Sequence, residues 1–270
     1  MSDMLLSTST STSTSTISIT GTTATVGTGG TAGSLDAPAR FEALPYSDRC
    51  RRVWRRGDHL LIGVSPGNSY FSPQRIAELL CWGGEFFGSM DIVYADLHVD
   101  TQFAAFGYPP DRALRRATKE IKTTHRRIQR GVEEAGLPGV RVRALSEFRS
   151  DAVYQGLHRS VLEALEDDPV FREAAEGMAR AFLAARTADG QDVSAAQLAA
   201  GVAYIAAELP FFLDTPKLLG VPTSVSCYHV QLPLTPVLFG RSEGLRAAPE
   251  QGYAVIRPLP GPQAPAVAAA

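Results

Sequence analysis

The stretch that decides the fold is "HLLIGVSPGNSYFSP", residues 59–73. It begins with an apolar run of strand length and continues with the turn-forming residues "SPGN". Ser72 and Pro73 then indicate the start of a helix, because serine caps a first turn and proline is tolerated at the first helical position. We expect this helix to run to about residue 87. A buried strand that leads through a tight turn into a helix is typical of a parallel α/β sheet.

The same alternation continues along the chain. Further strands are predicted for "MDIVYADLHV", "VRVRALSEF", "TSVSCYHV" and "YAVIRPL", the second of them with a short helical start at its end. Periodic apolar positions predict helices over residues 111–135, 152–166, 169–186 and 194–207. The sequence therefore predicts an α/β fold, Rossmann-like, with a mainly parallel sheet and flanking helices.

The two ends of the chain differ in composition from the part between them. Residues 1–40 are rich in Ser, Thr and Gly, as in "STSTSTSTST", and cannot bury a core. Residues 259–270 are rich in Pro and Ala. We expect a disordered N-terminal tail, a single domain over residues 41–258, and a loose C-terminal tail.

Bulk composition excludes several classes of protein. Three cysteines, none in a C-x-x-C pair, disfavour a disulfide framework or a zinc site, so we expect no metal and no cofactor. We expect no apolar run of membrane length, and the start of the chain lacks the basic and apolar regions of a signal peptide. These features predict a cytoplasmic protein without a membrane partner, and we expect a monomer.

Ser65 lies in a G-x-S-x-G pattern, Gly63 to Gly67, which is the pattern of a serine nucleophile on a strand-to-helix turn. Asp214 and His229 follow it in the chain order of a hydrolase triad. However, Pro66 has no N–H, whereas a hydrolase uses the N–H at this position to bind the oxyanion. Such a donor would have to come from a later residue of the turn. The alternatives are a hydrolase nucleophile, another kind of nucleophile, and a plain turn serine.

A basic stripe lies on the predicted helix 111–135. On a helical wheel, eight cationic side chains fall within one arc over about 27 Å of helix. These residues are Arg112, Arg115, Arg116, Lys119, Lys122, Arg126, Arg127 and Arg130. Leu114, Ile121, Ile128 and Val132 cluster on the opposite side, and only Glu120 intrudes near the edge of the stripe.

A solvated face usually mixes charges of both signs, which makes a stripe of one sign unusual in a chain of net charge −2. The pattern suits the phosphate backbone of a nucleic acid, although a solvated helix face remains the alternative. "DRCRRVWRR", residues 48–56, is a second basic cluster.

Tyr204 and Glu208 are spaced i, i+4 on one face of an otherwise apolar predicted helix. A carboxylate in such a pocket can hold an ammonium group or accept a proton, and a surface pair is the alternative. Tyr228 and His229 lie on a late predicted strand, where neighbouring side chains point to opposite faces.

Together these motifs resemble the cyclodipeptide synthases over about residues 45–258. The resemblance lies in "HLLIGVSPGNSYFS", "DIVYADLHVD", the basic helix, "AGVAYIAAELPFF" and "SVSCYHV", in that order. It implies the Rossmann-type fold of the tyrosyl and tryptophanyl tRNA synthetase catalytic domain. It also implies that two aminoacyl-tRNAs are converted to a cyclic dipeptide, a 2,5-diketopiperazine, by a ping-pong mechanism.

The resemblance assigns roles to single residues. Ser65 matches the nucleophile that becomes an aminoacyl ester, which the amine of the second aminoacyl-tRNA then attacks to give a dipeptidyl-enzyme. Asn68 matches a residue that organises the site. Tyr204 and Glu208 match the pair that anchors the substrate amine, and Tyr228 matches a proton shuttle. Asn68, Tyr228 and His229 resemble the Asn-Tyr-Gln-type subfamily, with His in the last place. The basic stripe matches the helix that receives the first tRNA.

The resemblance also outlines a pocket for the first aminoacyl group, whose apolar lining predicts a hydrophobic or aromatic residue. The residues implied are Leu61, Gly63, Val93, Ala95, Leu145, Met178, Phe211, Ser226 and His229. Core packing is the alternative for each of them.

Two positions depart from the family pattern. Pro66 follows the nucleophile, where a small residue is expected, so that an oxyanion donor would come from Gly67 or Asn68. Gln231 occupies a place that is acidic in some members. A serine esterase and a non-catalytic RNA-binding protein remain as rival functions.

Overall fold

The computed structural model describes residues 41–184 and 192–259, so the predicted tail 1–40 and, apart from Leu259, the predicted tail 259–270 lie outside the described residues. Six strands form one sheet in the order β1-β6-β5-β2-β3-β4. β1 pairs antiparallel with β6, and all other pairs are parallel. The strands are β1 (Phe41–Pro45), β2 (His59–Val64), β3 (Ser89–Tyr94), β4 (Arg141–Ala144), β5 (Ser224–Tyr228) and β6 (Gln251–Pro258). The predicted α/β fold with a mainly parallel sheet is confirmed.

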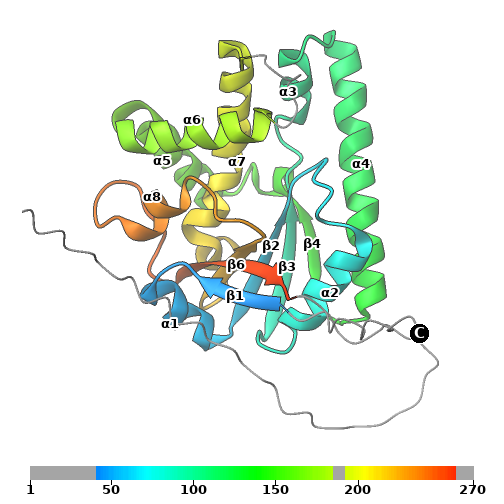
Figure 1. The fold of residues 1–270 in the computed structure, drawn as a ribbon, viewed down its shortest axis with the longest axis vertical. Coiled ribbons are helices and arrows are strands. Elements are labelled where there is room, and N and C mark those ends of the chain that lie inside the picture. The colour runs from blue at the N-terminus through cyan, green and yellow to red at the C-terminus, as the bar shows by residue number, and fades with distance from the viewer. Residues whose placement is uncertain (1–40, 185–191, 260–270) are drawn as a thin grey trace, which may run out of the picture. The chain divides into compact units, whose positions relative to one another are not determined.

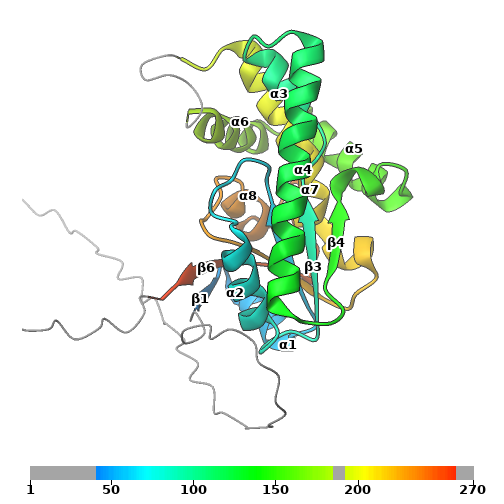
Figure 2. The same cartoon turned by 90° about the vertical axis from the view of Figure 1, so that its right-hand side faces the viewer.

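Helices cover both faces of the sheet. α2 and α4 lie against one face, and α5, α6 and α7 pack on the other (Figures 1 and 2). The helices are α1 (Asp48–Arg56), α2 (Pro73–Gly83), α3 (Val99–Ala105), α4 (Pro110–Ala135), α5 (Ala152–Asp167), α6 (Pro169–Ala184), α7 (Ala195–Leu219) and α8 (Thr235–Gly240), with a 3-10 turn η1 (Leu145–Phe148).

The alternation of side chains along β2 decides which residues face the site. Leu60, Ile62 and Val64 pack into the core under α2 and α4. Leu61 packs into the other core, under α5, α6 and α7. Because the side-chain period of a strand is two, Gly63 and the following Ser65 continue on the side of α7.

Close packing on α2 fixes the place of α4. A Cβ atom on Gly131 would lie 2.6 Å from Cβ of Ile76, so only glycine allows the two helices to approach this closely. The N-terminal part of α4 continues past the sheet beside α3, so that the basic helix borders the carboxyl ends of the strands (Figures 1 and 2).

Several predicted boundaries were wrong. The helix expected to residue 87 ends at Gly83, and the strand expected over 90–99 ends at Tyr94, since Val99 begins α3. The short elements β1, α1, α3 and α8 carry too few residues for a periodic signal and were not predicted. The predicted helix 169–186 is described to residue 184.

α7 is longer and more apolar than expected. It reaches Leu219, and a window of 18 residues has a mean hydropathy of 1.5, enough by length and composition for a membrane span. The expectation of no such run was therefore wrong. A core helix passes the same test, and 56% of that window is buried. The helix also breaks at Asp214, where the freed N–H of Thr215 donates to Gln251 Oε1 (3.0 Å).

Candidate active site

A tight turn presents Ser65 at the carboxyl end of β2. The N–H of Asn68 donates to the carbonyl of Ser65 (3.2 Å), and Gly67 has a φ of 76°. Proline at the second position and a glycine with positive φ at the third form a type II turn. The sequence "SPGN" therefore specifies this turn locally, and Gly67 is required because other residues are strained there.

Asn68 ties the turn to β5, to α4 and to the loop that follows the turn. Its side-chain Nδ2 donates to the Tyr228 hydroxyl (2.9 Å), and its Oδ1 accepts from the backbone N–H of Tyr70 (3.0 Å). Its backbone carbonyl accepts from Arg127 Nη1 on α4 (2.9 Å). Its backbone N–H also donates to Ser65, so both backbone groups and both side-chain polar atoms of Asn68 form hydrogen bonds that hold the turn.

The order of the strands creates a crevice at this point. β2 lies between β5 and β3, where the direction of chain connection reverses. Ligands of open α/β sheets bind beyond the carboxyl ends of the strands at such a switch point. Ser65 follows β2, and Tyr228 is the last residue of β5, so both lie at this crevice.

α7 supplies the carboxylate of the site. Burial raises the pKa of Glu208 to about 7, although nearby Tyr204 and Ser65 lower it in part. Burial raises the pKa of Tyr204 well above its usual range, with the Glu208 charge and Ser65 acting on the same hydroxyl. The surface-pair alternative fails, because Tyr204 is buried. Among the described residues, its hydroxyl lacks a partner with hydrogen-bond geometry.

Tyr228 completes the group. Burial and the nearby Glu208 raise the pKa of its phenol to about 12, although Asn68 and Ser65 lower it in part. Mutual electrostatic effects and the bond to Asn68 thus connect Ser65, Asn68, Tyr204, Glu208 and Tyr228. The structure brings together these five residues, which lie up to 163 positions apart in the sequence.

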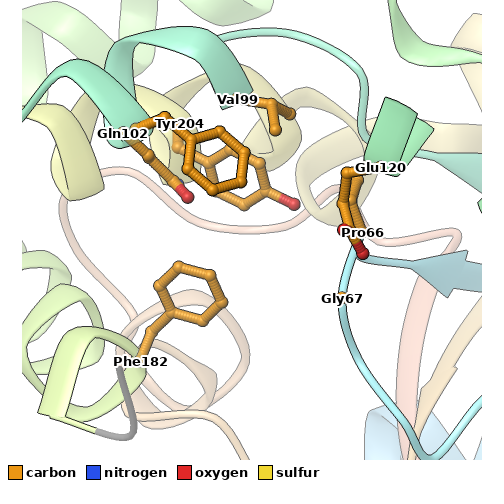
Figure 3. A pocket seen from close by; sticks show the side chains of 8 residues that line it. Pro66, Gly67, Val99, Gln102, Glu120, Phe182 and Tyr204 are labelled. Atoms are coloured by element: carbon orange, nitrogen blue, oxygen red, sulfur yellow. The ribbon is translucent and has the colours of Figure 1, made fainter. Parts of the chain in front are cut away.

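A cavity of about 310 Å³ lies beside the serine turn. Figure 3 shows Tyr204 and Phe182 across this cavity, with Pro66 and Gly67 along one side. Its lining is Pro66, Gly67, Val99, Gln102, Phe103, Glu120, Phe182 and Tyr204. Sequence reasoning missed the contributions of α3 and α6. Of the residues that line the cavity, Glu120 on α4 was the one with an unusual pattern in the sequence, as the acidic residue at the edge of the basic stripe.

The predicted aminoacyl pocket falls mostly within the core. Leu61, Val93, Ala95, Leu145 and Phe211 are buried in one cluster under α5, α6 and α7, on the same face of the sheet as Ser65.

Three more of its predicted residues differ from this group. Gly63 borders open space, because a Cβ atom there would meet nothing within 4 Å. The Ser226 hydroxyl accepts from Gln251 Nε2 (3.0 Å) and is buried. Met178 instead lines a much smaller apolar cavity with Leu209 and Phe212.

His229 lies beyond the end of β5 and packs among aromatic rings. Its ring stacks on Tyr70 at 4.1 Å between centroids and meets Phe71 edge-on at 5.9 Å. Burial lowers the His229 pKa, and its Nδ1 has no hydrogen-bond partner among the residues that the structure describes. An uncharged imidazole that supports the turn fits these contacts better than a charged ligand group.

The basic stripe of α4 is mostly exposed. Seven of its eight cationic residues are exposed, and Arg127 is half-buried against the serine turn. Near its start, Arg112 and Arg116 lie over the ring of Tyr108, at 5.4 and 4.6 Å from its centroid. The placement of Leu114 on the apolar side was wrong: it is 58% exposed, because Ala113 and Ala117 make the contacts there.

The second basic cluster forms α1, and part of its charge is used within the fold. Arg49 donates to the carbonyls of Ala247 and Ala248, and Arg51 pairs with Asp48. Arg52 and Arg55 remain exposed.

The hydrolase alternative does not find its triad. Asp214 accepts from the N–H of Lys217 at the break in α7 (3.0 Å), and His229 stacks on Tyr70. Within residues 41–184 and 192–259, the one histidine–carboxylate hydrogen bond joins His59 to Asp91. His59 begins β2, so about 20 Å of strand separates it from Ser65. Those residues also contain no group of three or more His, Cys, Asp and Glu that could hold a metal ion.

Comparison with known proteins agrees with this geometry. The family model described as cyclodipeptide synthase matches residues 41–258. A cyclo(L-tyrosyl-L-tyrosyl) synthase of Mycobacterium tuberculosis is 42% identical over 220 residues, 81% of this chain and 76% of that protein. A cyclo(L-leucyl-L-phenylalanyl) synthase of Streptomyces noursei is 41% identical over 84% of this chain and 96% of that protein.

A solved structure extends the match to the fold. A Mycobacterium tuberculosis protein, described as showing that cyclodipeptide synthetases are related to type I tRNA synthetases, superimposes with a TM-score of 0.74. The two chains are 40% identical, and the match covers 83% of this chain and 95% of that one. The chain described here belongs to the cyclodipeptide synthase family and is an enzyme that forms cyclic dipeptides.

Proposed function

We propose that this enzyme takes two aminoacyl-tRNAs and joins their aminoacyl groups through ester intermediates on Ser65. The observation that carries the proposal is the convergence of Tyr204, Glu208, Asn68 and Tyr228 on a single serine in a crevice bordered by a basic helix. A tRNA ester is already activated, so Ser65 needs no aspartate–histidine pair.

In the first step, Ser65 Oγ attacks the ester carbonyl of the first aminoacyl-tRNA. The bond to the tRNA ribose oxygen breaks, that oxygen takes up a proton, and an aminoacyl-serine remains. Asn68 N–H is bonded within the turn, so the N–H of Gly67 is the turn donor left for the developing oxyanion. Glu208, with a pKa of about 7, accepts the proton or holds the substrate ammonium group beside Tyr204.

The direction of the second step follows from the balance of bonds. Attack by the second aminoacyl-tRNA's amine on the seryl ester, as first expected, would release Ser65 and leave the dipeptide on tRNA. The amine of the aminoacyl-serine must instead attack the ester of the second aminoacyl-tRNA, which releases that tRNA and gives a dipeptidyl-serine. The new terminal amine then attacks the seryl ester, closes the ring and frees Ser65. Tyr228, bonded to Asn68, relays the proton of this closure.

The buried apolar surface beside Ser65 supports hydrophobic or aromatic aminoacyl groups. Leu61, Val93 and Phe211 are buried on this side of the sheet, and Gly63 leaves open space at the nucleophile. The relatives named above make cyclic dipeptides of tyrosine, leucine and phenylalanine.

The test is to incubate the purified enzyme with tyrosyl-, leucyl- and phenylalanyl-tRNA and to measure both products and adducts by mass spectrometry. Wild type should release cyclic dipeptides and carry an aminoacyl group on the Ser65 peptide. Ser65→Ala should lose the adduct and reduce product by more than about 10³-fold. Ser224→Ala is the matched control, since Ser224 is a serine of the same sheet whose hydroxyl bonds His59 at the other end of that sheet. An undiminished product yield from Ser65→Ala would exclude the covalent route.

A further inference from the structure

Arg127 differs from every other cation of the basic stripe. The remaining seven are exposed, whereas Arg127 is half-buried and its Nη1 donates to the backbone carbonyl of Asn68 at 2.9 Å. No carboxylate within the described ranges forms an ion pair with it. Its charge is therefore directed at a neutral carbonyl of the nucleophile turn.

The turn depends on few bonds of its own. Pro66 contributes no N–H, and the single backbone bond across the turn joins Asn68 to Ser65. Further constraints come through Asn68, from Tyr228 on the sheet side and from Arg127 on the α4 side. A charged donor to a carbonyl is among the stronger hydrogen bonds in proteins. Loss of Arg127 removes this hydrogen bond between α4 and the turn.

We propose that Arg127 is a positioning residue that holds the Ser65 turn against α4, rather than a contact to tRNA phosphate. The assignment rests on the proposed function, because it makes the orientation of Ser65 depend on the helix that we expect to bind tRNA. On this assignment, substitution of Arg127 should have a different measurable effect from substitution of the other cationic residues of the stripe.

Arg126 is the matched control, since it is adjacent on the same helix, has the same chemistry and is exposed. The two measurements are the dissociation constant for phenylalanyl-tRNA as a function of salt, and the single-turnover rate of Ser65 acylation at saturating phenylalanyl-tRNA. For Arg127→Met we expect a tRNA affinity within about twofold of wild type, an unchanged salt slope and acylation slowed by about 10–100-fold. For Arg126→Met we expect weaker binding, with the salt slope reduced by about one.

Arg127→Lys tests the geometry of the bond. Lysine keeps the charge but lacks the rigid guanidinium plane, so we expect tRNA binding to stay as in wild type and acylation to be restored only in part. Amide hydrogen exchange over residues 64–70 should increase in Arg127→Met and stay at the wild-type rate in Arg126→Met. This readout does not require activity, and it serves if acylation is too slow to follow.

Two results would distinguish a failure of the Arg127 inference from a failure of the proposed function. If Arg127→Met weakens binding and lowers the salt slope as Arg126→Met does, while acylation at saturation stays normal, then Arg127 is a phosphate contact and the inference is wrong. If wild-type enzyme forms no adduct on Ser65, the proposed covalent function fails. Faster exchange in Arg127→Met alone would then still support the positioning role.

Discussion

The two ends of the same sheet each hold a serine among polar groups, yet they are built for different purposes. At the amino ends, His59 Nδ1 bonds the Ser224 hydroxyl (2.8 Å) and His59 Nε2 bonds Asp91 Oδ2 (3.0 Å). This is the residue set of a hydrolase triad. All three side chains are buried, with no more than 1% exposed. A substrate therefore has no access to them.

At the carboxyl ends, no histidine of the described residues bonds Ser65, and the next two residues of its turn, Pro66 and Gly67, line a cavity of about 310 Å³. Its neighbours retain polar groups that can act on a substrate: Glu208 has a raised pKa, and among the described residues the Tyr204 hydroxyl lacks a partner with hydrogen-bond geometry. In the amino-end cluster the polar groups form hydrogen bonds with one another, and Arg141 also bonds both oxygens of Asp91 (2.8 and 2.6 Å). The comparison teaches that access and unsatisfied polar groups indicate a reactive site better than residue types do.

The largest effect is expected from Glu208→Gln at the carboxyl ends. Loss of the proton acceptor should slow product formation by about 10²–10⁴-fold. In wild type, activity should rise with pH through about 7, as Glu208 ionises, and this rise should vanish in the variant. A pH–rate profile of Ser65 acylation measures both. An unchanged profile in Glu208→Gln would assign the titration to another group.

The same substitution has an opposite effect on stability. The Glu208 pKa of about 7 lies above the value of about 4.3 in an unfolded chain, so the folded state binds more protons between these values. The free energy of unfolding should therefore fall as pH rises from about 4.3 to 7, by up to about 4 kcal/mol. Urea unfolding at several pH values should show a flatter profile for the variant.

A smaller effect is expected from Asp91→Asn at the amino ends, and here on stability alone. Burial would raise the Asp91 pKa, but hydrogen bonds from His59 and Arg141 outweigh it and lower the pKa. Its contribution is thus present above the usual Asp pKa of about 3.9 and is lost as pH falls below it. We expect the free energy of unfolding to fall by about 3 kcal/mol at neutral pH. The loss is not larger, because Arg141 is half-exposed and can return to water.

Ser224→Ala is the control for this substitution. It removes only the bond to His59 and should cost about 1 kcal/mol. Chemical denaturation measures both variants. An Asp91→Asn protein as stable as wild type would mean that the amino-end cluster contributes no net stability.

The smallest effect is expected from a pair of glycines at the two ends. A Cβ atom on Gly63 would meet nothing within 4 Å, so Gly63→Ala should leave stability unchanged or raise it by about 0.5–1 kcal/mol. The added methyl group should narrow the space beside Ser65 and shift the product distribution towards smaller residues. The ratio of tyrosine- to leucine-containing products measures this shift.

Gly83→Ala tests the closed end in the same way. Its Cβ would lie 2.7 Å from Leu60 Cδ2 and 2.9 Å from Met90 Sδ, so we expect a loss of about 1–3 kcal/mol. Product ratios should stay as in wild type. Equal stability of the two variants would contradict the difference in packing between the two ends.

The sequence by itself determined the features that depend on neighbouring residues. The turn at Ser65 to Asn68 follows from proline and glycine at fixed positions, and the helix after it starts at the predicted cap Ser72. The pattern of alternating strands and helices also predicted the α/β sheet. These features depend on backbone geometry and periodicity over short range, so the amino-acid sequence is enough to predict them.

Tertiary structure decided which of the polar residues share a site. Periodicity placed Glu120 at the edge of the basic stripe and Arg127 within it. In the folded structure, Glu120 lines the cavity and Arg127 donates to the Asn68 carbonyl. The burial that raises the Glu208 pKa comes from distant segments, as does the closed cluster around His59. Access and desolvation depend on contacts across the whole chain, so only the folded structure shows where chemistry can occur.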